Sequence, residues 1–190
     1  MRESNSGWIV LLVVLLIAAI ACWAVVSQYN GLIEQQEQVD RGLADIHTQL
    51  QRRADLIPNL VQAVSGYMEH EQNIIDSVTA SRERLLNTGS ISELAEADSA
   101  LTQALSNLFV VVENYPELKS SENIIQLQDE LAGTENRIAV ARRDYNALAE
   151  RFNTSIQKFP AVLMARMLGL QRAEYFQASG SAMEVPNVSF

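Results

Sequence analysis

The sequence is poor in the residues that usually build reactive or metal-binding sites. It has one cysteine, Cys22, and two histidines, His47 and His70, among 190 residues. A single cysteine excludes an intramolecular disulfide, and these three side chains do not complete a usual zinc site. His70-Glu71 also lacks the second histidine of the metalloprotease motif, because Ile74 stands at that position.

Patterns typical of catalysis are equally scarce. The chain has no glycine-rich phosphate loop, no serine or cysteine nucleophile set beside a histidine, and no carboxylate pair in an evident cleft. We therefore expect a protein that is not an enzyme, with no catalytic residues, cofactor or metal. The net charge of −9 argues against a nucleic-acid partner and against a domain lying flat on an anionic membrane surface.

One long stretch contains no charge, glycine or proline, and it runs from Trp8 to Val26. At a rise of about 1.5 Å per residue it reaches roughly 28 Å, close to the hydrocarbon thickness of a bilayer. Trp8 stands at one rim, and Trp23 and Tyr29 lie near the other, where amphipathic rings anchor helices. After a short head, 1–7, the stretch predicts a single-pass transmembrane helix, 8–26, in the lipid bilayer.

Two cleavable signals compete with this anchor. A secretory signal needs a basic head, but the head holds Arg2 together with Glu3, and the apolar run is longer than a usual signal core. A lipoprotein signal would use Cys22, but apolar residues continue after it, where a lipoprotein linker is normally polar. The uncleaved anchor is favoured. Arg2 before the span and Arg41 after it nearly balance, so the side of the soluble domain stays open.

After the span, apolar residues recur at steps of three and four. This pattern predicts amphipathic helices that pack as a bundle or coiled coil. The stripes run from Tyr29 to Ile57, then through Leu60, Val64, Tyr67, Ile74, Val78 and Leu85, then from Leu94 to Val112, and finally from Ile124 to Phe159. Gln36 and Arg53 interrupt the first stripe and can set its register. Ser90 or Ser92 suits a helix N-cap, with Glu93 behind it.

Pro58 leaves two paths open for the first two stripes. It removes a helical N–H and disfavours the α conformation at Ile57, so it either opens a second helix after a chain reversal or kinks one long helix. The absence of Gly or Asn before it favours the kink. The matched lengths of segments 28–57 and 58–87 favour the reversal.

The predicted fold is therefore all-α. The transmembrane helix continues, with no breaker between Val26 and Tyr29, into an antiparallel bundle of four-helix type with heptad seams, over 27–169. A short helix over 161–168 stops at Gly169. The tail, 170–190, is expected to be partly irregular.

Two charged clusters are candidates for partner contacts or for ion pairs between helices. Glu135 and Arg142 are seven residues apart and share a helix face. Charged groups on helices more often make structural pairs than functional sites, so the structural interpretation is favoured. The candidates are Arg52, Arg53 and Asp55 beside Pro58, and Glu135, Arg137, Arg142 and Arg143 in the last stripe.

Several blocks of the sequence form a distinctive set. They are 29–33, 49–61 with Gly66-Tyr67 and His70-Glu71 after it, 115–119, 134–139, 141–146, Phe152-Asn153, Phe159-Pro160 and 185–190. Together these blocks resemble the LemA family of bacterial membrane-anchored helical proteins. Leu43 and His47 depart from the family, which often has Trp and an acidic residue there. The resemblance implies a helical bundle behind one anchor in the bacterial cell membrane, and no established catalytic residues.

Related genes often lie near genes for membrane metalloproteases of the HtpX type, so the resemblance also suggests envelope stress or quality control by association. The leading hypothesis is a non-enzymatic scaffolding protein of the envelope that forms a homo-oligomer. The alternative is an envelope-stress sensor or adaptor that binds a partner such as a membrane protease.

Overall fold

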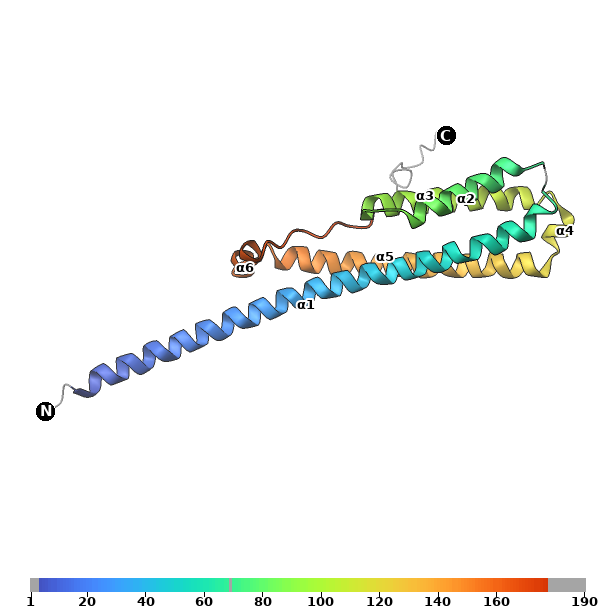
Figure 1. Ribbon diagram of the computed structural model, residues 1–190. Coiled ribbons are helices and arrows are strands. Elements are labelled where there is room, and N and C mark those ends of the chain that lie inside the picture. Colours follow the sequence, from blue (N-terminus) through green and yellow to red (C-terminus); the bar gives the residue numbers. More distant parts are fainter. Residues whose placement is uncertain (1–3, 69, 178–190) are drawn as a thin grey trace, which may run out of the picture. The chain divides into compact units, whose positions relative to one another are not determined.

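The computed structural model describes residues 4–68 and 70–177, and every regular element in this part of the chain is a helix. Figure 1 shows the elements in chain order: α1 (Ser4–Ser65), α2 (Gln72–Leu86), α3 (Ile91–Val112), α4 (Pro116–Lys119), α5 (Glu122–Ser155) and α6 (Ala161–Leu168). The all-α prediction is confirmed. Residues 170–177 of the predicted tail have no regular secondary structure, and 178–190 lie outside the described residues.

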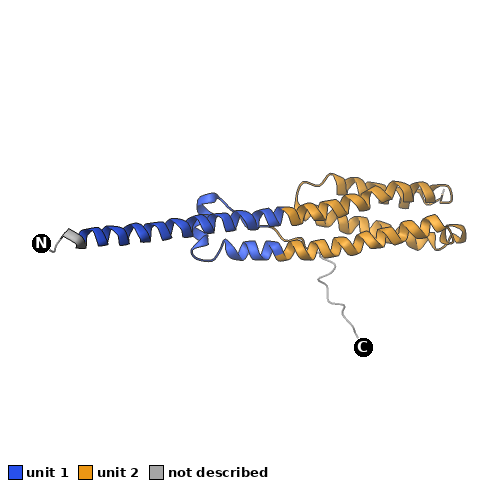
Figure 2. Ribbon diagram, turned by 90° about the horizontal axis from the view of Figure 1, so that it is seen from below, with its two compact units in different colours: residues 1–40, 148–173 blue, residues 41–147, 174–190 orange. Residues whose placement is uncertain are grey.

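The chain divides into two compact units, coloured separately in Figure 2. Unit 1 comprises residues 1–40 and 148–173, and unit 2 comprises residues 41–147 and 174–190. In unit 1, Leu32 and Val39 of α1 are buried, as are Phe152 of α5 and Ala161 and Ala165 of α6. These apolar side chains form the core of unit 1.

Unit 2 is a helical bundle built from the predicted stripes. The α3 stripe is buried at every predicted position, namely Leu94, Leu101, Leu105, Leu108 and Val112. Within unit 2, Arg53 of α1 meets Glu135 of α5, whereas Asn59 and Gln62 line a pocket with Asn123. Higher numbers on α1 thus meet lower numbers on α5, so the two helices are antiparallel there.

Pro58 lies inside α1, which runs on to Ser65, so the reversal at Pro58 does not occur. The chain turns between α1 and α2 instead. Proline cannot donate the hydrogen bond that the carbonyl of Ala54, four residues earlier, would accept in a regular helix. Nε of Arg82 on α2 donates to this carbonyl at 2.8 Å. A donor from the neighbouring helix therefore satisfies the group that proline leaves free.

The turn after Ser65 corrects the second predicted stripe, which assumed one helix over 58–87. Leu60, Val64, Val78 and Leu85 are buried as predicted, but Tyr67 is 53% exposed and Ile74 is only half-buried. Met68 and Ile75 are buried in their place. The helical phase restarts after the turn, so a stripe extrapolated across it selects the wrong residues.

Local capping chemistry sets the helix ends. Ser90 is the N-cap of α3, because its side chain accepts a hydrogen bond from the Glu93 N–H. Glu93 in turn accepts from the Gly89 N–H at 3.0 Å, and this bond holds the pKa of the Glu93 carboxyl below its ordinary value. Gly169, with φ 68°, ends α6 in the left-handed conformation that favours glycine. Of the two predicted N-cap candidates, Ser90 is the N-cap and Ser92 is not, and the predicted end at Gly169 is confirmed.

The last predicted stripe extends too far. It holds along α5, where Ile124, Leu131, Ile138, Tyr145 and Phe152 are buried, but α5 ends at Ser155. Phe159 lies beyond that end, in front of a cis bond to Pro160, and is 81% exposed. Its position after the helix removes it from the helical phase on which the prediction depended.

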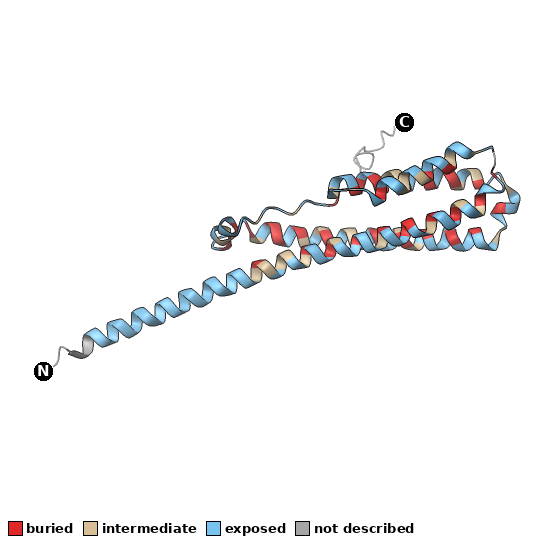
Figure 3. Cartoon of the chain, viewed as in Figure 1, coloured by how far each residue is buried: buried red, intermediate tan, exposed pale blue. Residues whose placement is uncertain are grey.

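The N-terminal part of α1 is the apolar helix that the sequence predicts. Residues 7–30 are all exposed, with Trp8 at 70%, Trp23 at 73% and Tyr29 at 43% (Figure 3). A stretch of this helix has a mean hydropathy of 3.2 and no buried residues. Its length and composition suffice to cross a membrane.

Candidate functional site: a buried ion network in unit 2

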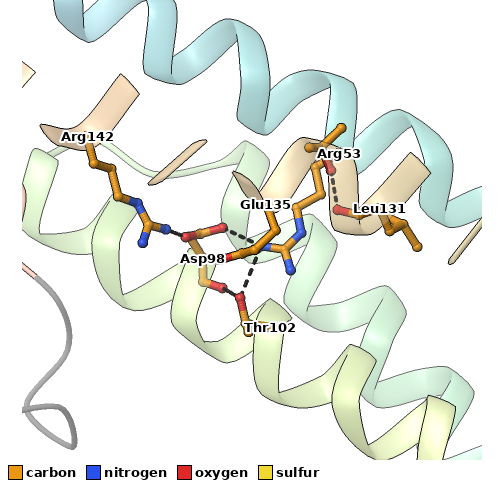
Figure 4. Close-up of polar contacts among 7 residues, drawn as sticks. Arg53, Asp98, Thr102, Leu131, Glu135 and Arg142 are labelled. Atoms are coloured by element: carbon orange, nitrogen blue, oxygen red, sulfur yellow. Dashed lines mark hydrogen bonds and ion pairs between the residues drawn. The ribbon is translucent and has the colours of Figure 1, made fainter. Parts of the chain in front are cut away.

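Arg53 of α1 is the centre of a buried polar cluster in unit 2. Its side chain is 4% exposed, and its Nη1 donates to Oδ1 of Asp98 at 2.9 Å and to the Thr102 hydroxyl at 3.0 Å. Nη1 also lies 2.6 Å from Oε2 of Glu135. One arginine thus joins α1 to α3 and α5 (Figure 4).

Asp98 holds a second arginine. Its carboxylate is fully buried, and Oδ2 is ion-paired with Nη2 of Arg142 on α5. The guanidinium of Arg142 also lies over the ring of Phe176, 4.8 Å from the ring centre. An arginine over an aromatic face gains a cation–π attraction. Arg142 therefore connects the ion network to the segment after α6.

The electrostatics of the network balance attraction against loss of water. Burial lowers the pKa of Arg53, and the charge of Glu135 partly opposes this effect. Burial also lowers the pKa of Arg142, and repulsion from Arg53 adds to it. Two arginines face two carboxylates, so the charges of the cluster cancel. Such a buried network fixes which helices meet, and removing one member leaves an uncompensated charge.

The segment after α6 is held through its backbone. In unit 2, the Tyr145 hydroxyl donates to the Glu174 carbonyl at 2.7 Å. The Asn146 amide donates to the Phe176 carbonyl at 2.9 Å and accepts from the Phe176 N–H at 2.8 Å. In unit 1, Asn153 makes the same pair of bonds with Ala173, at 2.9 and 2.8 Å.

The structure brings together three of the seven charged candidates, Arg53, Glu135 and Arg142. The other four do not join them. Arg52 and Arg137 are exposed, Asp55 accepts a hydrogen bond from Gln51 on the surface, and Arg143 pairs with exposed Asp144 at 3.5 Å. Whether any of the seven contacts a partner stays a prediction.

Asp98 is the member of the network that sequence reasoning missed. It lies four residues after Leu94 and three before Leu101, so it occupies a position on the buried α3 stripe. A carboxylate at such a position is a sign of a buried charge that needs a partner. Among the described residues, no group of three His, Cys, Asp or Glu side chains could hold a metal ion.

The apolar half of α1 and the ion-paired bundle define a membrane-associated helical protein. The chain belongs to the LemA family, whose model matches residues 42–190, and this confirms the resemblance. It is 29% identical over 194 residues to Magnetosome protein MamQ 2 of Paramagnetospirillum magneticum, covering 88% of this chain and 71% of that protein. It is 28% identical over 158 residues to Protein LemA of Metamycoplasma hominis, covering 81% and 71%. These names state no enzymatic activity.

Proposed function

We propose that this protein is a non-enzymatic structural protein of the bacterial envelope, anchored by one membrane-spanning helix and self-associating through its helical domain. The observation that carries the proposal is an exposed apolar stripe on α5 in unit 2. Ile125, Ala132 and Ala139 follow one another at heptad steps and are all exposed. The buried face of α5 is a different one, so the bundle does not use this stripe.

A row of exposed apolar residues at heptad spacing forms one of the two rows of a coiled-coil seam, against which a second helix can pack. Small side chains at two of the positions let a neighbouring helix approach closely. An anchor in the membrane raises the local concentration of bundles, because all copies then move in one plane. A second copy of this chain is therefore the partner that the stripe fits.

The oligomer is tested with the full chain solubilised in detergent. Light scattering over a dilution series should give a mass above that of one 21.1 kDa chain. Ala139→Lys should shift the mass toward the monomer by placing a charge in the stripe. Glu130→Lys, which is exposed on another face of α5, is the control and should leave the mass unchanged. A wild-type protein that is monomeric at every concentration would end the proposal.

The second candidate function is a sensor or adaptor, and the backbone bonds of Asn146 favour it. Bonds to the backbone do not depend on the side chains of the segment they hold, so a peptide from a partner can replace Phe176 there. Asn146→Ala removes both of these bonds and should then reduce binding of a purified membrane protease to the chain. Unchanged binding in this variant and in a charge-reversed Arg53→Glu variant would count against the adaptor.

A further inference from the structure

The short helix α6 and the residues before it expose an apolar surface on unit 1. Phe159 is 81% exposed, Leu163 55% and Met167 82%, and each follows the last by four residues. The opposite side of α6 is buried through Ala161 and Ala165. On α6, Leu163 and Met167 are four residues apart and so lie above one another, and Phe159 lies just before the helix. We call Phe159, Leu163 and Met167 the α6 patch.

The α6 patch begins beside the place where α1 leaves the predicted span. Within unit 1, Phe159, Pro160 and Ala161 line one pocket together with Ser27 and Leu32 of α1. Ser27 and Leu32 lie one and six residues beyond Val26, or about 1.5 Å and about 9 Å along the helix axis. The headgroup layer on each side of a bilayer is roughly 5–8 Å thick. The start of α6 therefore lies at about the depth of the headgroups.

The charge around the α6 patch differs from that of the whole chain. Residues 148–173 hold four basic side chains and one acidic side chain, which gives +3, whereas the chain carries −9. Lys158 and Arg166 directly flank the patch. The acidic residues of α1 in this unit start at Glu34, about 12 Å beyond Val26 along the helix. The basic side chains are thus the ones next to the membrane surface.

We propose that the α6 patch is a second membrane contact, which lies in the headgroup layer of an anionic leaflet beside the point where α1 leaves it. Phe159, Leu163 and Met167 enter the boundary with the acyl chains, and Lys158 and Arg166 reach the phosphates. An amphipathic helix with basic flanks binds a membrane surface in this way. The inference rests on the membrane anchoring in the proposed function. The proposed contact involves only this basic segment of unit 1.

The test measures the depth of single labelled cysteines in vesicles. The full chain is reconstituted in phosphatidylcholine with phosphatidylglycerol, and an environment-sensitive fluorophore is attached to one cysteine at a time. Native Cys22 reports on the anchor. Met167→Cys, in a Cys22→Ala background, reports on the α6 patch. Glu37→Cys in the same background is the control, because Glu37 is exposed in unit 1 and lies about 16 Å beyond Val26.

Nitroxide groups on the lipid acyl chains should quench the fluorophore at position 22 and at position 167, and leave position 37 unquenched. Quenching at 167 should weaken in pure phosphatidylcholine and in an Arg166→Glu variant. Quenching at 22 with none at 167 overturns the α6 contact and leaves the anchor intact, whereas no quenching at 22 overturns the anchor itself. A blue-shifted fluorophore at 167 that lipid nitroxides do not quench would mean that a second copy covers the patch, which also overturns the proposal.

Discussion

The two halves of α1 form one helix with opposite patterns of burial. Residues 7–30 are all exposed. From Leu32 to Val64, buried positions recur at steps of about three, four or seven residues, as on one face of a helix. Both halves are helical, so helix formation does not separate them. The difference lies in periodicity. A helix that is apolar on every face suits lipid, whereas a helix with one apolar stripe suits a bundle.

The second half of α1 also contains a buried charged residue, whereas the apolar first half contains no charged residue in the predicted span. Arg53 lies on the buried stripe, yet Asp98 and Glu135 meet it there. The first half has no charged residue between Trp8 and Val26. A bundle can therefore bury a charge if a partner comes with it, and substitutions that add or remove charge should act differently on the two halves.

The largest effect is expected from Asp98→Ala. It leaves Arg53 and Arg142 buried without their shared partner, and breaking a buried pair in this way costs about 3–5 kcal/mol. Denaturant unfolding of the solubilised protein measures the loss. The control is Asp144→Ala, which breaks an exposed pair and should cost at most about 1 kcal/mol. If Asp98→Ala and Asp144→Ala lost the same unfolding free energy, Asp98 would not be compensating the buried charges of the two arginines.

Ile17→Arg tests the first half. An arginine at the centre of a transmembrane helix disfavours insertion by about 2.5–3.5 kcal/mol. The expected result is that alkaline carbonate extracts a larger fraction of this variant than of the wild type from membranes. Thr48→Arg, at an exposed position of the second half, should leave the chain in the membrane fraction. If both variants remained in the membrane fraction to the same extent, the result would contradict the conclusion that the first half of α1 lies in lipid and the second half does not.

Arg82→Met tests how the second half passes through Pro58. The variant leaves the Ala54 carbonyl buried without a donor, which should cost about 1–3 kcal/mol of unfolding free energy. In a Pro58→Ala background the restored N–H can serve that carbonyl, so the same Arg82→Met change should cost less. A cost that is independent of residue 58 would contradict the role given to Arg82.

The smallest effect is expected where the two halves meet. A Cβ at Gly31 would find no atom within 4 Å, so Gly31→Ala should stabilise α1 by about 0.5–1 kcal/mol. The thermal midpoint measures this gain. Gly133→Ala in α5 has the same free space and should give a similar gain. A loss at Gly31 alone would mean that the junction needs a flexible residue.

Local chemistry explains what could be predicted from the sequence. Ser90, Gly169 and the α3 stripe depend on residues within one or two helical turns, and all three predictions hold. The path at Pro58 could not be decided in this way, because the donor that completes it, Arg82, comes from another helix. The same limit applies to the ion network. Its key carboxylate, Asp98, bonds to an arginine 45 residues away.

The asparagine bonds to the tail have a consequence for how this sequence can vary. Asn153 binds the N–H and the carbonyl of Ala173, and Asn146 binds the same groups of Phe176. Every amino acid except proline carries both groups. Related sequences should therefore carry many different residue types at the position of Ala173, but not proline. At the position of Phe176 the range of residue types should be narrower, because the buried ring also faces Arg142.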